Sequence, residues 1–246
     1  EDIDFFKSRT INGQLAAEDI NENFTTGKIA ILVTTNNKKD GINMHKLRTL
    51  LPDEDEYTCL STDSITDANA KSCRPELLQA YEKKGKKGVV KNLIIRNKAP
   101  VVITENHNIG RYKEDGISNG SRGYIDYIQT DKDGQVEIIW VVFKDEKIGS
   151  KCYKRETQKY RPKDATYIDQ KALPIRQTYS NMEVKYMGHT YIRRRFAISL
   201  AYAMTVHKCQ GQTMDEVIID FDPDENNHSF ITKGSFYVAI TRVTKA

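Results

Sequence analysis

The most constraining feature of the chain is the uninterrupted run at residues 29–34, IAILVT. A short apolar run of this kind, rich in β-branched residues, is typical of a strand that is buried on both faces of a sheet. Asn36 follows closely and is suited to cap a helix on which Ile42, Met44 and Leu47 are the apolar positions. A buried strand that leads into a capped helix indicates an α/β domain with a parallel sheet.

A different pattern begins near residue 93, where short β segments replace the alternation of strand and helix. The expected strands span residues 93–96, 100–104, 122–130, 136–143 and 183–196. The dipeptides Asn119-Gly120 and Asp133-Gly134 lie between strand-forming runs, and such dipeptides are strong hairpin signals. We therefore expect residues 93–195 to form a small β-barrel, inserted into an α/β domain that residues 1–92 and 196–246 build together.

A cluster of polar residues occurs at an expected strand-to-helix junction in residues 199–212, SLAYAMTVHKCQGQ. Within seven residues it offers a hydroxyl, an imidazole, an ammonium, an amide and a flexible backbone, from Thr205, His207, Lys208, Gln210 and Gly211. Such groups suit phosphate oxygens. Simpler alternatives stay open, since a lone Thr or His often satisfies nearby backbone, Lys208 can be a solvated neighbour, and glycine can end a helix.

The apolar segment 236–243, FYVAITRV, carries Arg242 as its only charged residue. The rigid guanidinium fork of arginine matches a phosphate better than the ammonium of lysine does. We therefore interpret Arg242 as a phosphate-directed side chain. The alternative is a salt bridge to a nearby carboxylate.

These two segments resemble motifs V and VI of superfamily 1 helicases, and the wording AYAMTVHKxQGQT points to the branch that contains the Pif and RecD families. Residues 31–36, ILVTTN, are similar to motif IV of that branch. Residues 99–106, APVVITEN, and residues 117–123, ISNGSRG, match two further signatures of it in the correct order. The resemblance therefore covers nearly the whole chain.

The resemblance implies a second RecA-like motor domain, with a barrel of the Src-homology-three type at residues 93–195. In such helicases ATP and Mg²⁺ lie between two RecA-like domains, and single-stranded DNA crosses both. Arg242 would be the catalytic arginine finger, and Gln210 and Gly211 would lie near the γ-phosphate of ATP. The residues expected to contact the DNA backbone are Thr34, Thr35, Asn36, Thr205, His207 and Lys208. The branch also implies movement from 5′ to 3′ and a role in DNA replication or repair.

The chain has no phosphate loop of the form G-x-x-x-x-G-K-[ST], which holds the nucleotide in ATPases of this kind. Asp145 and Glu146 are not expected to bind a metal, because Lys144 separates them from the preceding apolar run and no phosphate loop comes before them. We therefore expect the partner of this chain to be a missing N-terminal RecA-like domain. This chain alone should neither bind ATP tightly nor hydrolyse it.

Composition narrows the function classes without selecting one. The formal net charge of +4 agrees with a nucleic-acid partner but does not require one. The four cysteines, Cys59, Cys73, Cys152 and Cys209, lack zinc-ligand spacing and fit an intracellular protein with reduced thiols, in nucleus, cytoplasm or viral replication site. No apolar run has the length of a membrane span.

Two rival functions stay open. A viral RNA helicase can carry similar motifs V and VI, although residues 99–106 and 117–123 favour the DNA helicase branch. The other rival is a non-catalytic nucleic-acid-binding module without a first motor domain. Unwinding of duplex DNA compared with duplex RNA would separate the first rival from the main hypothesis.

Overall fold

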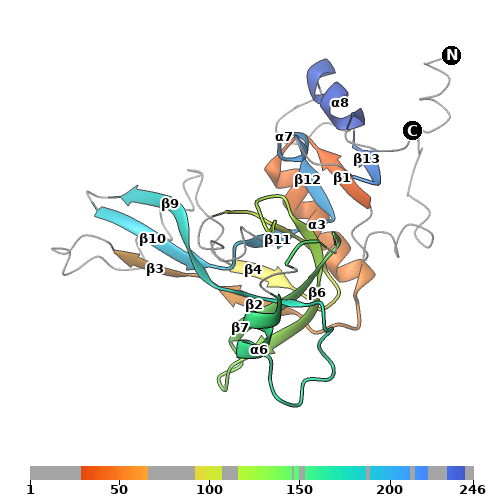
Figure 1. Cartoon of the computed structure of the whole chain (residues 1–246). Helices are drawn as coiled ribbons and strands as arrows, with labels where there is room; N and C mark the ends of the chain where they lie inside the picture. The colour runs from red at the N-terminus through yellow and green to blue at the C-terminus, as the bar shows by residue number, and fades with distance from the viewer. Residues whose placement is uncertain are drawn as a thin grey trace.

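The computed structural model describes residues 29–65, 92–106, 116–145, 147–149, 153–186, 189–210, 214–220 and 232–241. Within them it contains a small parallel sheet with its helices, and several antiparallel sheets (Figure 1). Two of the expected site residues, Gly211 and Arg242, lie outside the described residues. No helix among the described residues is both long and apolar enough to cross a membrane.

The parallel sheet has the strand order β12-β1-β13. Its strands are β1 (Ile29–Val33), β12 (Ala203–Thr205) and β13 (Glu216–Ile219), and every residue of β1 is buried. This agrees with the strand expected from residues 29–34, because a central strand in a covered parallel sheet is enclosed on both faces.

Helix α3 (Asn36–Leu50) follows β1 after a two-residue turn. Leu47 is buried, and Ile42 and Met44 pack against the same core, as expected from the apolar positions of this helix. The expected cap was wrong by one residue. Thr35 is the N-cap, and its hydroxyl accepts a hydrogen bond of 3.3 Å from the backbone N–H of Lys38, so Asn36 is the first helical residue.

A five-stranded antiparallel sheet has the order β11-β5-β6-β7-β8. Its strands are β5 (Pro100–Ile103), β6 (Arg122–Thr130), β7 (Val136–Phe143), β8 (Leu173–Arg176) and β11 (Ile198–Leu200). The hairpin expected at Asp133-Gly134 is confirmed: β6 and β7 pair around it, and Gly134 has a φ of 77°, which glycine adopts without strain. Asn119-Gly120 forms a turn just before β6 instead of a two-residue hairpin.

Two smaller sheets complete the described fold. The first pairs β2 (Tyr57–Leu60) with β4 (Asn92–Ile95). The second joins β3 (Thr62–Ile65), β10 (His189–Arg195) and β9 (Thr178–Tyr186), and it extends as an arm to the left in Figure 1. The single strand expected over 183–196 was wrong, because β9 and β10 are two antiparallel strands that pair with each other.

Strand pairing crosses both of the expected domain boundaries. β2 and β3 precede residue 93 but pair with β4 and β10, and β11 follows residue 195 but pairs with β5. Within the part of the chain that the structure describes, β11 and β8 are the free edges of the five-stranded sheet. The closed barrel and the division at residues 93–195 therefore stay predictions.

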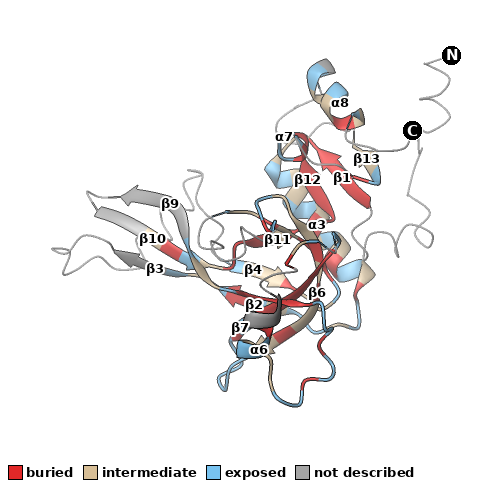
Figure 2. Ribbon diagram, in the orientation of Figure 1, coloured by how far each residue is buried: buried red, intermediate tan, exposed pale blue. Residues whose placement is uncertain are grey.

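One hydrophobic cluster joins the two kinds of sheet. Ile31 and Val33 of β1 and Leu47 of α3 belong to the same buried cluster as Val101 of β5 and Ile125 of β6. Figure 2 shows buried residues in β1 and β12 as well as along β7. The parallel sheet therefore shares its core with the antiparallel sheet on one face.

The other two clusters are local. One includes Leu32 and Met204 of the parallel sheet together with Ala239 of α8 (Lys233–Ile240). The other surrounds Trp140 of β7, which is fully buried under the segment that contains Ile168, close to helix α6 (Tyr153–Tyr160). The residues of the candidate site lie next to the first of these local clusters.

Candidate nucleotide and nucleic-acid site

The ends of neighbouring parallel strands bring two expected site segments to one edge of the sheet. Val33, the last residue of β1, is paired in register with Thr205, the last residue of β12. Thr34, Thr35 and Asn36 continue from β1, and His207 follows β12 two residues after Thr205. Ligands of open α/β sheets bind at the carboxyl ends of the strands. The two segments are about 170 positions apart in the sequence, yet they lie at the same edge of the sheet, where a ligand is expected.

The start of helix α3 lies at this edge. No acidic residue occupies its first turn. No carboxylate in that turn therefore neutralises the partial positive charge of the helix N-terminus. Lys38 Nζ pairs with Asp220 Oδ1 at 2.8 Å, and this ion pair connects α3 to the end of β13. Lys39 Nζ lies 2.9 Å from Asp40 Oδ1 and 3.5 Å from Asn36 Oδ1.

Helix α7 (Val206–Cys209) presents polar residues on one side and apolar residues on the other. His207, Lys208 and Gln210 are exposed, whereas Val206 and Cys209 are buried. Partial desolvation lowers the pKa of Lys208, and the positive charges of Lys39 and Arg195 lower it further, against the opposing effect of Asp40. Because positive charges gather around Lys208, an anion near it would be stabilised.

Thr205 differs from the other expected DNA contacts because only 6% of it is exposed. It is the N-cap of α7, but its side chain makes no capping hydrogen bond. Thr34 and Thr35 are half-buried, and Asn36 is exposed. The structure therefore brings the six expected contacts together, with Thr205 as the inner member of the group.

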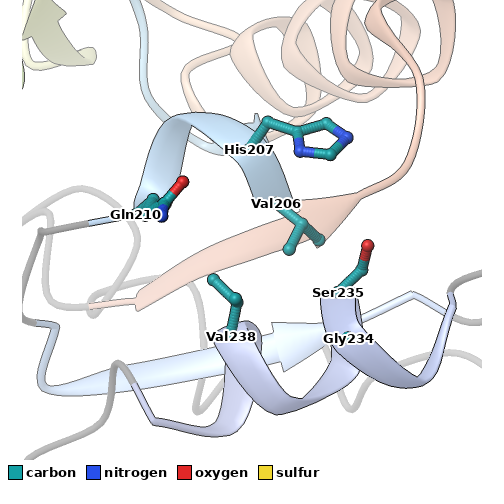
Figure 3. Close-up of a pocket in the computed structure, with 6 residues that line it drawn as sticks. All are labelled: Val206, His207, Gln210, Gly234, Ser235 and Val238. Atoms are coloured by element: carbon teal, nitrogen blue, oxygen red, sulfur yellow. The ribbon is translucent and has the colours of Figure 1, made fainter.

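A pocket of about 150 Å³ separates α7 from α8. In Figure 3, His207 and Gln210 project from α7 while Ser235 and Val238 lie across from them on α8. Thr232 caps α8, since its hydroxyl accepts a hydrogen bond of 3.1 Å from the backbone N–H of Ser235. The pocket is smaller than the roughly 300 to 1,000 Å³ typical of a complete small-molecule site. The pocket is therefore large enough for only part of a small-molecule site.

Three residues near this edge were not found by sequence reasoning. Lys38 and Asp220 are 182 positions apart, so no local pattern links them. Asn43 lies on the buried side of α3 and contacts β12, yet a lone asparagine in a helix reads as an exposed polar residue. Among the described residues, no group of three or more His, Cys, Asp or Glu is placed to hold a metal ion.

Comparison with known proteins shows a similarity to helicases in part of the sequence and in the fold. Residues 142–246 match the viral superfamily 1 RNA helicase core domain. The fold is shared with solved Pif1 structures. The resemblance to superfamily 1 helicases is therefore confirmed. No curated protein sequence is detectably similar to the chain.

Two crystal structures of Pif1 helicases illustrate the shared fold. The Pif1 helicase from Candida albicans superposes with a TM-score of 0.60 at 18% identity, over 99% of this chain and 47% of that one. The Bacteroides Pif1 bound to single-stranded DNA superposes with a TM-score of 0.55 at 15% identity, over 97% of this chain and 42% of that one. The chain thus spans about half the length of these helicases. The parallel sheet and its helices fit a RecA-like helicase domain.

Proposed function

We propose that the chain is the C-terminal motor portion of an ATP-dependent DNA helicase that moves from 5′ to 3′. It binds single-stranded DNA and acts together with an N-terminal RecA-like domain that supplies the phosphate loop. The observation that carries this proposal is the paired end of β1 and β12, where Val33 and Thr205 are in register and two polar segments meet at one edge. A Pif1 of the same fold is described as bound to single-stranded DNA, which supports the choice of ligand.

Backbone recognition explains the types of residue at this edge. Thr34, Thr35 and Asn36 offer hydroxyl and amide groups beside the N-terminus of α3, and His207 and Lys208 offer an imidazole and an ammonium. Groups of these kinds bind phosphate and sugar and position a strand without reading its bases. A motor that moves along any sequence needs contacts of this type.

Nucleotide hydrolysis would occur at the interface with the other RecA-like domain. Gln210 would contact the γ-phosphate region from the pocket between α7 and α8, with Gly211 beside it. Arg242 would follow α8 and stabilise the charge on the transferring phosphoryl group. Mg²⁺ would be held by the phosphate-loop domain and the nucleotide. A Bacteroides Pif1 of this fold is described in complex with ADP-AlF3 and single-stranded DNA, which supports ATP as the nucleotide.

The test uses Arg242→Ala in the helicase that contains both motor domains. We expect DNA-stimulated ATP hydrolysis to fall by about 10³ to 10⁵, because an arginine finger acts on the transition state, while nucleotide affinity stays near the parental value. Arg242→Lys keeps the charge but loses the fork and should also be strongly impaired. Hydrolysis at the parental rate in Arg242→Ala would remove this role. The 246-residue chain alone should hydrolyse no ATP above background.

An RNA helicase is the second candidate, and one observation favours it. The matched family over residues 142–246 is described as a viral RNA helicase core domain. Unwinding rates on DNA and RNA duplexes with the same sequence and the same single-stranded tail separate the two candidates. Faster unwinding of RNA would select the second candidate. Binding without unwinding of either duplex, by a protein that contains both motor domains, would indicate a non-catalytic module.

A further inference from the structure

The side chain of Asn43 makes two hydrogen bonds to the backbone of a single residue of β12. Its Nδ2 donates to the carbonyl oxygen of Ala203 at 3.1 Å, and its Oδ1 accepts from the backbone N–H of Ala203 at 2.8 Å. Only 3% of Asn43 is exposed, and Ala203 is buried as well. Both polar groups of the amide are therefore satisfied inside the protein by the same residue.

This pair of bonds replaces a strand at the edge of the sheet. β12 pairs with β1 on one side, where the backbone N–H of Ile31 donates to the carbonyl oxygen of Tyr202 at 2.8 Å. The N–H and C=O groups of Ala203 point away from β1, and α3 covers them. A buried backbone group without a partner is costly, so an amide in this position fixes β12 against α3.

The contact links the two polar segments of the candidate site. Asn43 is two helical turns after Asn36, on the helix that Thr35 caps. Ala203 comes two residues before Thr205, from which α7 and His207 follow. The spacing between the two segments therefore depends on how α3 sits against β12.

We propose that Asn43 is a positioning residue for single-stranded DNA binding, which sets the distance between the segment at Thr34 to Asn36 and the segment at Thr205 to Lys208. This inference rests on the proposed function, because it concerns the same ligand. Asn43 does not touch the DNA. It acts through the backbone of Ala203.

The chemistry of the amide provides a selective test. In Asn43→Asp, an ionised carboxylate accepts from the N–H of Ala203 but repels its carbonyl oxygen. Protonation of the introduced carboxyl restores a donor, and burial raises the pKa of such a group, to about 6 or above. Asn43→Leu has a similar volume and removes both bonds at every pH. Asn92→Asp makes the same chemical change at an exposed position on β4 and is the matched control.

Two measurements on each variant of the 246-residue chain would test the proposal. Hydrogen exchange of the Ala203 backbone N–H reports the contact itself. Fluorescence anisotropy with labelled oligothymidylate reports DNA affinity, at temperatures where circular dichroism shows the variant to be folded. Affinities are compared as the ratio of variant to parent at each pH, because the neighbouring side chains of His45, Lys46 and His207 are present in both proteins. Neither β1 nor β12 contains a titratable side chain.

We expect Asn43→Asp to bind DNA about tenfold more weakly than the parent near pH 8, equivalent to the loss of one hydrogen bond of about 1.4 kcal/mol. The ratio should return toward one as the pH falls to about 5, since the introduced carboxyl then donates to Ala203. Asn43→Leu, which removes both hydrogen bonds, should be at least about tenfold weaker at both pH values. Asn92→Asp should match the parent throughout.

Several results would overturn the assignment. Folded Asn43→Asp and Asn43→Leu that bind DNA as the parent does would show that Asn43 has no positioning role. Variants that are unfolded at every pH would make Asn43 a stability residue only. A weakened affinity with unchanged exchange at Ala203 would mean that the effect does not pass through this contact. A parent chain that binds no DNA would instead defeat the proposed function, while the exchange at Ala203 would still report whether the contact forms.

Discussion

The parallel and antiparallel sheets of this protein use their strands in different ways. The parallel strands β12, β1 and β13 have only three, five and four residues, and their ends carry the polar residues of the candidate site. The antiparallel strands β6 and β7 have nine and eight residues, and β7 buries nearly all of its length between two clusters. The short parallel sheet carries the polar residues of the candidate site at its strand ends, whereas the longer antiparallel sheet supplies apolar contacts to the core.

The two regions are not independent, because specific contacts join them. The guanidinium of Arg122 on β6 donates to the carbonyl oxygens of Ile29 and Ala201, at 3.3 and 3.1 Å. Ile29 is the first residue of β1, and Ala201 comes two residues before β12. The antiparallel sheet therefore holds the parallel strands at the end opposite to the candidate site. The small sheet therefore shares its core and hydrogen bonds with its neighbour at one end, and it carries the candidate site at the other end.

The largest effect is expected from removing the antiparallel region. Replacement of residues 93–195 by a short Gly/Ser linker should unfold the remaining chain, because β3 and β11 lose their partners, β2 loses nearly all of its partner, and the shared core is opened. Far-UV circular dichroism and hydrogen exchange of β1 measure this. A remaining chain that stays folded would support the division at residues 93–195.

The next effect concerns the cluster that belongs to the antiparallel sheet alone. Trp140→Ala should lower the free energy of unfolding by about 3–5 kcal/mol, since Trp140 is fully buried. Its cluster contains no residue of the parallel sheet, so DNA affinity of the folded molecules should not change. Denaturant unfolding and anisotropy measure the two quantities. Tyr167→Ala, at a position that is 57% exposed, is the control, and a loss of affinity in Trp140→Ala would show that the regions are coupled more widely.

A smaller loss of stability is expected from Arg122, which joins the antiparallel sheet to the parallel one. Burial lowers the pKa of Arg122 to about 10, against a weaker opposing effect of Asp215, so the side chain stays charged at neutral pH. Arg122→Met should cost about 1.5–3 kcal/mol, because it removes the charged donor from two backbone carbonyls. Chemical denaturation measures the loss. Arg176→Met changes an exposed arginine of β8 and should cost less; equal losses would remove the special role given to Arg122.

The smallest effect is expected at a surface ion-pair group that also bridges the regions. Glu56 accepts from Arg48 of α3 and from Arg96 after β4, each at 3.1 Å, and these arginines lower the pKa of Glu56 although partial desolvation opposes them. A carboxyl with a lowered pKa stabilises the fold above its unfolded pKa and loses this contribution as the pH falls through its folded pKa. Glu56→Gln should therefore reduce the melting temperature slightly near pH 7 and leave it unchanged near pH 2. A reduction that persists in acid would point to packing instead of charge.

Local patterns in the sequence predicted the elements that depend on near neighbours. The apolar run at residues 29–34 predicted β1, and Asp133-Gly134 predicted the turn between β6 and β7. The resemblance to superfamily 1 helicases implied that the polar cluster after residue 199 and the segment at residues 34–36 share a ligand, and the register of Val33 with Thr205 brings them to one edge. Their individual roles, and those of Gly211 and Arg242, stay predictions.

The features that sequence reasoning missed depend on distant pairings. The single strand expected over 183–196 is instead part of the hairpin of β9 and β10. The second strand of this hairpin, β10, also pairs with β3, which lies about 120 residues earlier in the chain. The cap of α3 is Thr35 instead of Asn36, because both residue types cap helices and the geometry of the preceding strand decides between them. Periodicity reports which face of an element is buried, but it does not say which element buries it.

The contact of Asn43 with Ala203 also bears on self-association. An edge strand with free N–H and C=O groups is a template on which a strand of another molecule can add. Within the described residues β12 is an edge of the parallel sheet, and α3 lies over its outer side with the Asn43 amide on the backbone of Ala203. The same side chain that fixes this strand therefore denies its backbone to other chains, and loss of the amide would favour aggregation through β12.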